Sequence, residues 1–145
     1  MPTSEKRPLQ VQLPFQPKTY DIDFAGHVSN IVYIRWLEDL RNKLLDTYLP
    51  LAVLMERGIS PVVTQTLITY KKPVKIFDSV SGLMWGKEAG NVKWTLSAEF
   101  TVRGNIVSTA EQLGVFVRID NGRPAPFPEE FQQEFVLFHK KENKD

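Results

Sequence analysis

The sequence contains no cysteine and only two histidines in 145 residues. The absence of cysteine excludes a disulfide scaffold, a thiolate metal site and a cysteine nucleophile. The two histidines, His27 and His139, are too few and too far apart in the sequence to indicate a zinc site. The chemistry of this chain must therefore come from other side chains or from its backbone.

An excess of charge of either sign is also absent. The chain has 18 lysine and arginine residues against 17 aspartate and glutamate residues, a formal net charge of +1. This balance produces no overall field that would attract nucleic acid or an anionic membrane. Residues 1–10 lack the apolar core of a signal peptide, and no apolar run approaches the length that spans a membrane. We therefore expect a soluble, cytoplasmic protein that binds neither nucleic acid nor a membrane.

The length of the chain favours a single domain with a core of its own. Residues 1–14 include Pro2, Pro8 and Pro14, and we expect them to form a flexible leader. Residues 15–139 would form the domain, and residues 140–145 a short charged tail.

One long helix is predicted near the start of this domain. Ser29 is a suitable N-cap residue for a helix that begins at Asn30 and that Pro50 ends. Apolar side chains recur on one face of this helix at steps of three and four residues: Tyr33, Leu37, Leu40 and Leu44. A short second helical segment is expected from residue 51 to residue 57.

The remainder of the domain favours strands, because β-branched residues are frequent and glycine-containing turns separate the runs. The expected strands cover residues 15–20, 62–70, 78–85, 92–103 and 106–119. A turn is predicted at residues 86–91, and a last helix at residues 129–139. This order predicts an α+β fold, in which an antiparallel sheet of about five strands curls around the long central helix.

The segment before the long helix brings an acid close to a helix start. The first amides of a helix have no intrahelical partner and carry a partial positive charge. If the Ser29 hydroxyl accepts the amide of Ile31 or Val32, the Asn30 amide remains free for a ligand. Asp23 lies just upstream, so its carboxylate would approach a site that polarises a carbonyl group. This pairing suits the transfer of an acyl group to water.

The segment Asp23-Phe-Ala-Gly-His-Val-Ser-Asn30, followed by Tyr33, Glu38 and Arg41, resembles the signature of hotdog-fold acyl-CoA thioesterases. Within that family it is most similar to the 4-hydroxybenzoyl-CoA thioesterase-like group. Two later segments resemble strands of the same family: residues 69–73 with Asp78, and residues 115–120. One departure is Ser29, where these enzymes commonly carry asparagine.

The resemblance implies a hotdog fold and a homodimer that pairs two sheets edge to edge, with the active sites at the dimer interface. Tetramers are also common in the family. The implied reaction is the hydrolysis of an acyl-CoA thioester to a free acid and CoA, without a metal or a prosthetic group.

The resemblance assigns catalytic roles to Asp23, His27 and Asn30. Asp23 would attack the thioester carbon or activate a water molecule, and the sequence leaves both alternatives open. An aspartate in such a loop could also do no more than shape the turn. The Asn30 amide would hold the thioester oxygen. His27 would orient the substrate or the water, or else donate to a backbone carbonyl within the bend.

Further residues are expected to contact the substrate: Gly26, Val28, Tyr33, Glu38, Lys71 and Lys72. The two lysines, together with Arg103, are candidates for binding the phosphates of CoA. Three apolar residues could line an acyl pocket or belong to the core: Phe24, Trp36 and Met84.

Glu38 is a second candidate for the catalytic carboxylate. It follows Asn30 by eight residues, which places it about 12 Å further along the helix at ~1.5 Å per residue. It therefore cannot reach a carbonyl held at the start of its own helix, although it could serve a partner subunit. We expect it to pair with Arg41 or Arg35.

Two other functions fit the same fold. One is a thioesterase that acts on an acyl carrier protein, which a basic docking patch beside the site would favour. The other is a non-catalytic protein that binds acyl-CoA and releases no thiol. The order of residues does not reveal the acyl group, and it does not separate a dimer from a tetramer.

Overall fold

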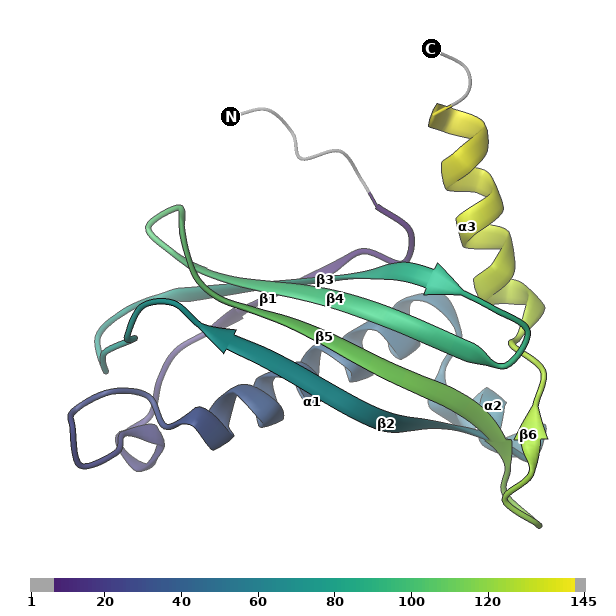
Figure 1. Cartoon of the computed structure of the whole chain (residues 1–145), viewed down its shortest axis with the longest axis horizontal. Coiled ribbons are helices and arrows are strands. Elements are labelled where there is room, and N and C mark those ends of the chain that lie inside the picture. The colour runs from purple at the N-terminus through teal and green to yellow at the C-terminus, as the bar shows by residue number, and fades with distance from the viewer. Residues whose placement is uncertain (1–6, 143–145) are drawn as a thin grey trace.

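The long helix α1 (Asn30–Tyr48) lies along one face of an antiparallel sheet (Figure 1). A computed structural model describes residues 7–142 of the chain. The start of α1 at Asn30 confirms the prediction, and the helix ends two residues before Pro50, whose ring cannot continue it. The short helix α2 (Leu51–Glu56) follows at once, as predicted. The buried face of α1 carries apolar side chains at helical spacing: Val32, Tyr33, Trp36, Leu37, Leu40 and Leu44.

All strand pairs in the sheet are antiparallel, and the strands run in the order β1–β3–β4–β5–β2, with β6 paired to β5. Their bounds are β1 (Val11–Phe15), β2 (Ile59–Tyr70), β3 (Val80–Ala89), β4 (Lys93–Val102), β5 (Asn105–Arg118) and β6 (Pro124–Ala125). The predicted α+β fold is confirmed. The sheet has six strands rather than about five because β6 adds a pairing of two residues.

The first strand was placed wrongly by the sequence pattern. The expected strand at residues 15–20 is instead β1, four residues earlier, and residues 19–21 form one turn of 3-10 helix. Residues 11–14 therefore belong to the sheet and not to the expected leader. Val11 and Leu13 alternate with exposed Gln12 and Pro14, as in a strand with one covered face. Pro14 is tolerated because β1 is an edge strand, where one side of the backbone needs no partner.

Gly86 also has a different role from the one predicted. The turn expected at residues 86–91 begins later, because β3 continues to Ala89 with a register shift just after Gly86. A Cβ atom at this glycine would lie 2.6 Å from the ring of Phe135, which packs directly on the strand. A glycine inside a strand often marks such a bulge or close approach rather than a turn.

The last helix, α3 (Glu129–Glu142), stands at the end of the sheet where β3 finishes and points away from α1 (Figure 1). An ion pair between Arg57 and Glu130 joins the residue after α2 to α3. Helix α3 runs through residues 140–142, which the sequence assigned to the tail, while residues 1–6 and 143–145 lie outside the described range. Within that range no helix is both long enough and apolar enough to cross a membrane.

Candidate active site

The segment from Asp21 to Ser29 forms a closed loop directly before α1. The Ser29 amide donates to the Asp21 carbonyl oxygen at 2.8 Å, so the loop starts and ends at the same point. One step further in, Ile22 and Val28 form an antiparallel bridge. The buried Asp21 carboxylate accepts the Lys18 amide at 2.8 Å and so fixes the turn before the loop. Backbone hydrogen bonds, together with the Asp21 carboxylate, thus hold this segment against the start of the helix.

The tip of the loop is a three-residue hairpin turn between Asp23 and His27. The Asp23 amide donates to the His27 carbonyl oxygen at 2.8 Å, and the Gly26 amide donates to the Asp23 carbonyl oxygen at 3.0 Å. Gly26 has a φ of +80°, and a Cβ atom there would meet nothing within 4 Å. Glycine is therefore needed for the backbone conformation and not for space. A type I turn followed by a left-handed residue is a common form of such hairpins.

The Asp23 carboxylate is half-buried and braces this turn. Its Oδ1 accepts hydrogen bonds from the amides of Ala25, at 2.9 Å, and His27, at 3.2 Å. No donor among residues 7–142 bonds its Oδ2. The turn-shaping role that the sequence left open is therefore real, and it holds the carboxylate in one orientation with its second oxygen available.

The start of α1 presents free amide donors. Neither the Asn30 amide nor the Ile31 amide makes a hydrogen bond to the part of the chain that the structure describes. The Val32 amide donates to the Ser29 carbonyl oxygen at 3.0 Å, and the Ser29 side chain makes no capping hydrogen bond. The predicted cap position is confirmed, but the predicted hydroxyl contact is wrong, because the backbone carbonyl already serves the first turn. The Tyr70 hydroxyl donates to the Asn30 carbonyl oxygen at 3.1 Å and ties β2 to this end of the helix.

The other predicted residues of this segment lie in different environments. The half-buried His27 imidazole makes no hydrogen bond within the described residues, so the expected contact to a carbonyl is absent. Val28 is 4% exposed, and its amide donates to the Val74 carbonyl oxygen at 2.8 Å. Gly26 is exposed at the hairpin tip. Asp23, His27 and the Asn30 amide therefore gather around one loop, whereas Val28 serves to dock it.

Tyr33 belongs to an aromatic cluster behind the helix start. Its ring meets Tyr70 edge to face at 5.2 Å between centroids, and it is only 3% exposed. Burial, and secondarily the charge of Tyr70, raise the pKa of Tyr33 to about 12. The rest of the cluster is Phe15, Trp36 and Phe100. Of the three residues considered for an acyl pocket, Trp36 and Met84 lie in the core, while Phe24 is fully exposed.

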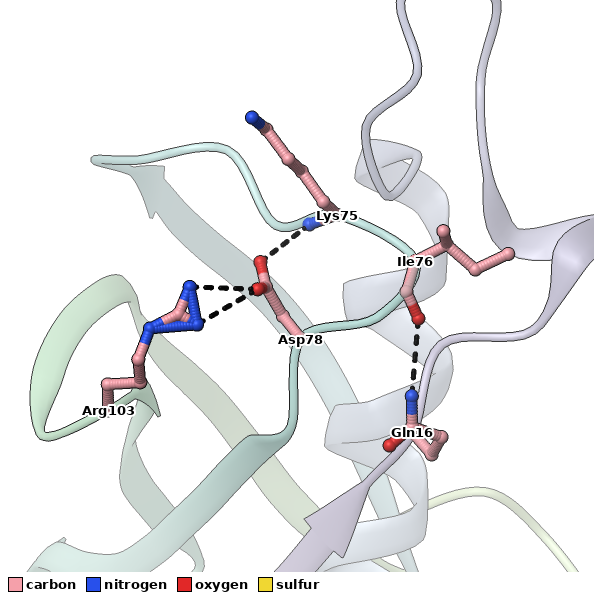
Figure 2. A network of polar contacts seen from close by, with 5 residues as sticks. All are labelled: Gln16, Lys75, Ile76, Asp78 and Arg103. Carbon is pink, nitrogen blue, oxygen red and sulfur yellow. Dashed lines mark hydrogen bonds and ion pairs between the residues drawn. The ribbon is translucent and has the colours of Figure 1, made fainter.

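The loop between β2 and β3 lies beside the closed loop, because the Val74 carbonyl oxygen receives the Val28 amide. It carries the exposed side chains of Lys71 and Lys72 at the end of β2. Figure 2 shows how Asp78 anchors this loop: its Oδ2 accepts the Lys75 amide at 2.8 Å, and Arg103 donates to its Oδ1 at 3.3 and 3.4 Å.

On the neighbouring chain segment, Gln16 donates to the Ile76 carbonyl oxygen at 3.2 Å (Figure 2). Arg103, which the sequence offered as a ligand for CoA phosphates, forms an ion pair with Asp78 instead. The two lysines form no ion pair with another described residue.

Glu38 lies near the middle of α1, away from this loop, with its side chain exposed. It forms no ion pair within residues 7–142, so the expected pairing with Arg41 or Arg35 is absent. Arg41 instead donates from Nη1 to Oε1 of Gln112 at 2.8 Å. Burial lowers the pKa of Arg41, and the nearby charge of Glu38 partly offsets that effect. Gln112 was missed by the sequence reasoning, because a single glutamine inside a strand pattern carries no local signal.

Within the described range no three histidine, aspartate or glutamate side chains gather as metal ligands would. What the loop and the helix start can do chemically is hold an acyl oxygen on free amides next to an oriented carboxylate.

The model of the thioesterase-like superfamily matches residues 17–135. SAV2348 from Staphylococcus aureus, solved in complex with CoA, superposes with a TM-score of 0.83 at 17% identity, covering 93% of this chain and 87% of that one. A 1,4-dihydroxy-2-naphthoyl-CoA thioesterase from Synechocystis, Slr0204, gives 0.78 at 16% identity, covering 88% and 96%. The gentisyl-coenzyme A thioesterase BH1999 gives 0.77 at 20% identity, covering 86% and 99%. A comparison with curated proteins finds no match.

Proposed function

Because this chain belongs to the thioesterase-like superfamily and has the hotdog fold, we propose that it hydrolyses an acyl-CoA thioester to a free acid and CoA. The observation that carries the proposal is the closed loop before α1. It holds the Asp23 carboxylate in one orientation and leads directly into the unpaired Asn30 amide, the two groups that we assign to thioester hydrolysis.

The reaction would begin with the thioester oxygen on the Asn30 amide, where the positive end of α1 stabilises the charge that develops in the transition state. Asp23 then either attacks the thioester carbon through its free oxygen or takes a proton from an attacking water. In the first case the thiolate of CoA leaves and water hydrolyses the resulting anhydride. In the second case the tetrahedral intermediate expels CoA directly. His27, whose imidazole is half-buried on the same loop, would orient the substrate or the water.

The CoA portion would extend toward Lys71 and Lys72 on the neighbouring loop. Both side chains are exposed, and neither is neutralised by an ion pair to a described residue, so they can meet phosphate charge. The relatives support this ligand, since one solved structure of the fold holds CoA and two others are named as thioesterases of aromatic acyl-CoAs. The same lysines, with Lys75, would also suit an acidic carrier protein, so assays should compare an acyl-CoA with the matching acyl carrier protein thioester.

A homodimer is part of the proposal. Strand β2 is an edge of the sheet and is 12 residues long, and such an edge is a template for pairing with a second copy. Exposed apolar side chains lie along this edge, namely Leu67 and Tyr70, and Ile31 is exposed at the helix start that Tyr70 contacts. Pairing at this edge would bring the exposed Glu38 of each copy toward the site of the other, the route by which it could serve catalysis.

The decisive test is thiol release from short, long and aromatic acyl-CoAs by Asp23 variants. We expect Asp23→Asn to lower kcat by about 10²–10⁴, because it removes the base or nucleophile. The asparagine oxygen can still accept the amides of Ala25 and His27, so the loop and the free energy of unfolding should change little. Asp39→Asn, an exposed carboxylate on α1, is the matched control and should remain active.

Three outcomes would count against this proposal. If Asp23→Asn is active and only Asp23→Ala is inactive, Asp23 braces the turn and takes no part in the chemistry. If both variants turn over normally while Glu38→Gln is inactive, the catalytic carboxylate is Glu38. Tight acyl-CoA binding without any thiol release by the wild-type protein would make this a binding protein.

A further inference from the structure

A cavity of about 320 Å³ lies between the second half of α1 and α3. Part of its wall is aromatic: Trp94, Phe116, Phe127, Phe131 and Phe135. These rings support one another, for example through the stack of Phe116 on Phe131 at 5.9 Å between centroids. Small-molecule pockets usually measure about 300–1,000 Å³, so the cavity has room for one small ligand with an apolar body.

Trp94 contributes a polar atom that has no partner. The residue is 7% exposed, and its indole Nε1 is buried without a hydrogen bond to any described residue. Buried donors are nearly always paired, because an unpaired one costs free energy. Trp94 lines the cavity, and a small turn of its ring would bring this enclosed N–H group to an acceptor atom on a ligand there.

Arg41 places a cation on the same lining. Its Nη1 is held by Oε1 of Gln112, which is 2% exposed and donates in turn from Nε2 to Oγ1 of Thr66 at 3.1 Å. The other guanidinium N–H groups make no hydrogen bond to the described part of the chain. A partly buried network therefore fixes the guanidinium in one position and leaves its other N–H groups available to a ligand.

The strand register brings these donors to neighbouring positions. Trp94 pairs with Gly114, and Leu96 with Gln112, on the inner face of β4 and β5. Trp94 and Gln112 are therefore diagonal neighbours, about 7–8 Å apart. The absence of a side chain at Gly114 lets the indole lie over the strand, since a Cβ there would come within 2.0 Å of Trp94 Cζ2.

The cavity is separate from the candidate active site of the same chain. Arg41 follows Asn30 by eleven residues, about 16 Å along the helix at ~1.5 Å per residue. The buried rings of Tyr33, Trp36 and Phe100 fill the interior beside the first half of α1. None of these three rings belongs to the lining of the cavity.

We propose that this cavity binds an apolar monocarboxylic acid, whose carboxylate accepts hydrogen bonds from Arg41 and from the Trp94 indole while its body lies among the aromatic rings. Two carboxylates of the lining, Glu38 and Glu88, oppose an anion, but both are exposed and screened by solvent, whereas Arg41 is half-buried. The hydrolysis proposed above releases an acid of this class. Acid binding itself is measured without turnover and does not rest on that function.

The test uses decanoate as the probe and decan-1-ol as its uncharged counterpart. The chain has three tryptophans, so the indole N–H groups should give three resonances in a ¹H–¹⁵N spectrum, and the Trp94→Phe variant identifies one of them. Decanoate should shift the Trp94 resonance saturably and leave that of the half-exposed Trp85 in place. Decan-1-ol should bind at least tenfold more weakly, because it cannot pair with the guanidinium.

Variants of the lining sharpen this test. Trp94→Phe keeps the ring and loses the N–H group, and it should weaken decanoate binding about tenfold by calorimetry. Arg41→Met should weaken it by at least as much, while Glu38→Gln should strengthen it a few-fold by removing the opposing charge. Lys43→Met, on the same helix but outside the lining, is the matched control and should bind as the wild type does.

Three results would overturn the proposal. The first is no saturable shift at millimolar decanoate. The second is equal affinity for decanoate and decan-1-ol, or unchanged affinity in Trp94→Phe and Arg41→Met variants that fold normally. The third is complete displacement of decanoate by saturating CoA, which would assign the cavity to the thioester site. Loss of hydrolysis in Asp23→Asn with decanoate affinity retained would leave both proposals standing separately.

Discussion

The two halves of α1 are built by different kinds of constraint. At its start, a single stretch of nine residues closes on itself by backbone hydrogen bonds, carries Asp23 at its hairpin turn and leads into the free amides of the helix. Beside its second half, the lining of the cavity comes from α1, α2, β2, β3, β4, β5 and α3, and few of these residues are neighbours in sequence. The first site depends on local conformation, and the second depends on packing between distant elements.

Two glycines illustrate the difference between local conformation and packing of distant elements. Gly26 is required by its φ of +80°, although a Cβ atom there would touch nothing within 4 Å. Gly114 has no such backbone requirement, but a Cβ atom there would overlap the ring of Trp94. The same change, glycine to alanine, should therefore act through backbone strain at one end of the helix and through collision at the other.

The largest effect is expected from Gly114→Ala. The new Cβ would lie 2.0, 2.3 and 2.5 Å from three atoms of the Trp94 ring, so the indole has to leave its position over the strand. Overpacking of this kind should lower the free energy of unfolding by about 3 kcal/mol, measured by urea denaturation. The matched control is Gly90→Ala, whose Cβ would be 3.6 Å from its nearest neighbour, the Lys93 carbonyl oxygen, and should change stability by less than ~0.5 kcal/mol. Equal stability of the two variants would mean that the indole moves into the cavity without cost.

The burial of Tyr33 in the aromatic cluster beside the first half of α1 should make the free energy of unfolding depend on pH in the alkaline range. Burial raises the pKa of Tyr33 from 10.0 to about 12, so below pH 10 the phenol is neutral in both the folded and the unfolded chain. Above pH 10 the unfolded chain loses this proton first, and stability falls until the folded phenol also ionises near pH 12. Between these values the wild type should lose about 2 kcal/mol more than Tyr33→Phe, measured by urea denaturation at each pH. A parallel decline in both proteins would show that the phenol is not shielded as the structure indicates.

The contrast between local and distant constraint also explains what the sequence could predict. The start of α1 at Asn30 and its end before Pro50 follow from a cap residue and a proline, signals that lie within a few positions of the boundary. The loop around Asp23 could be singled out for the same reason, since its acid, its glycine and its helix start are contiguous in the chain.

Errors arose where one residue type has two structural meanings. Pro14 suggested a frayed leader but lies in an edge strand, where the missing donor costs little. Gly86 suggested a turn but makes room for Phe135 of α3. The contact between Arg41 and Gln112 joins residues 71 positions apart, so only the folded sheet register brings them together. No spacing in the sequence could have indicated the cavity that they help to line.

The smallest change in stability, with a large change in activity, is expected from Gly26→Ala. Alanine at a φ of +80° costs about 1 kcal/mol, and relief of that strain would open the hairpin that orients the Asp23 carboxylate. Thiol release should fall more than tenfold, because a displaced catalytic group costs rate even when the fold survives. The matched control is Gly122→Ala, which has a φ of +69° and equally open space but lies after β5. It should show the same loss of stability in urea and normal thiol release, whereas loss of hydrolysis in both variants, or in neither, would break the link between the hairpin and catalysis.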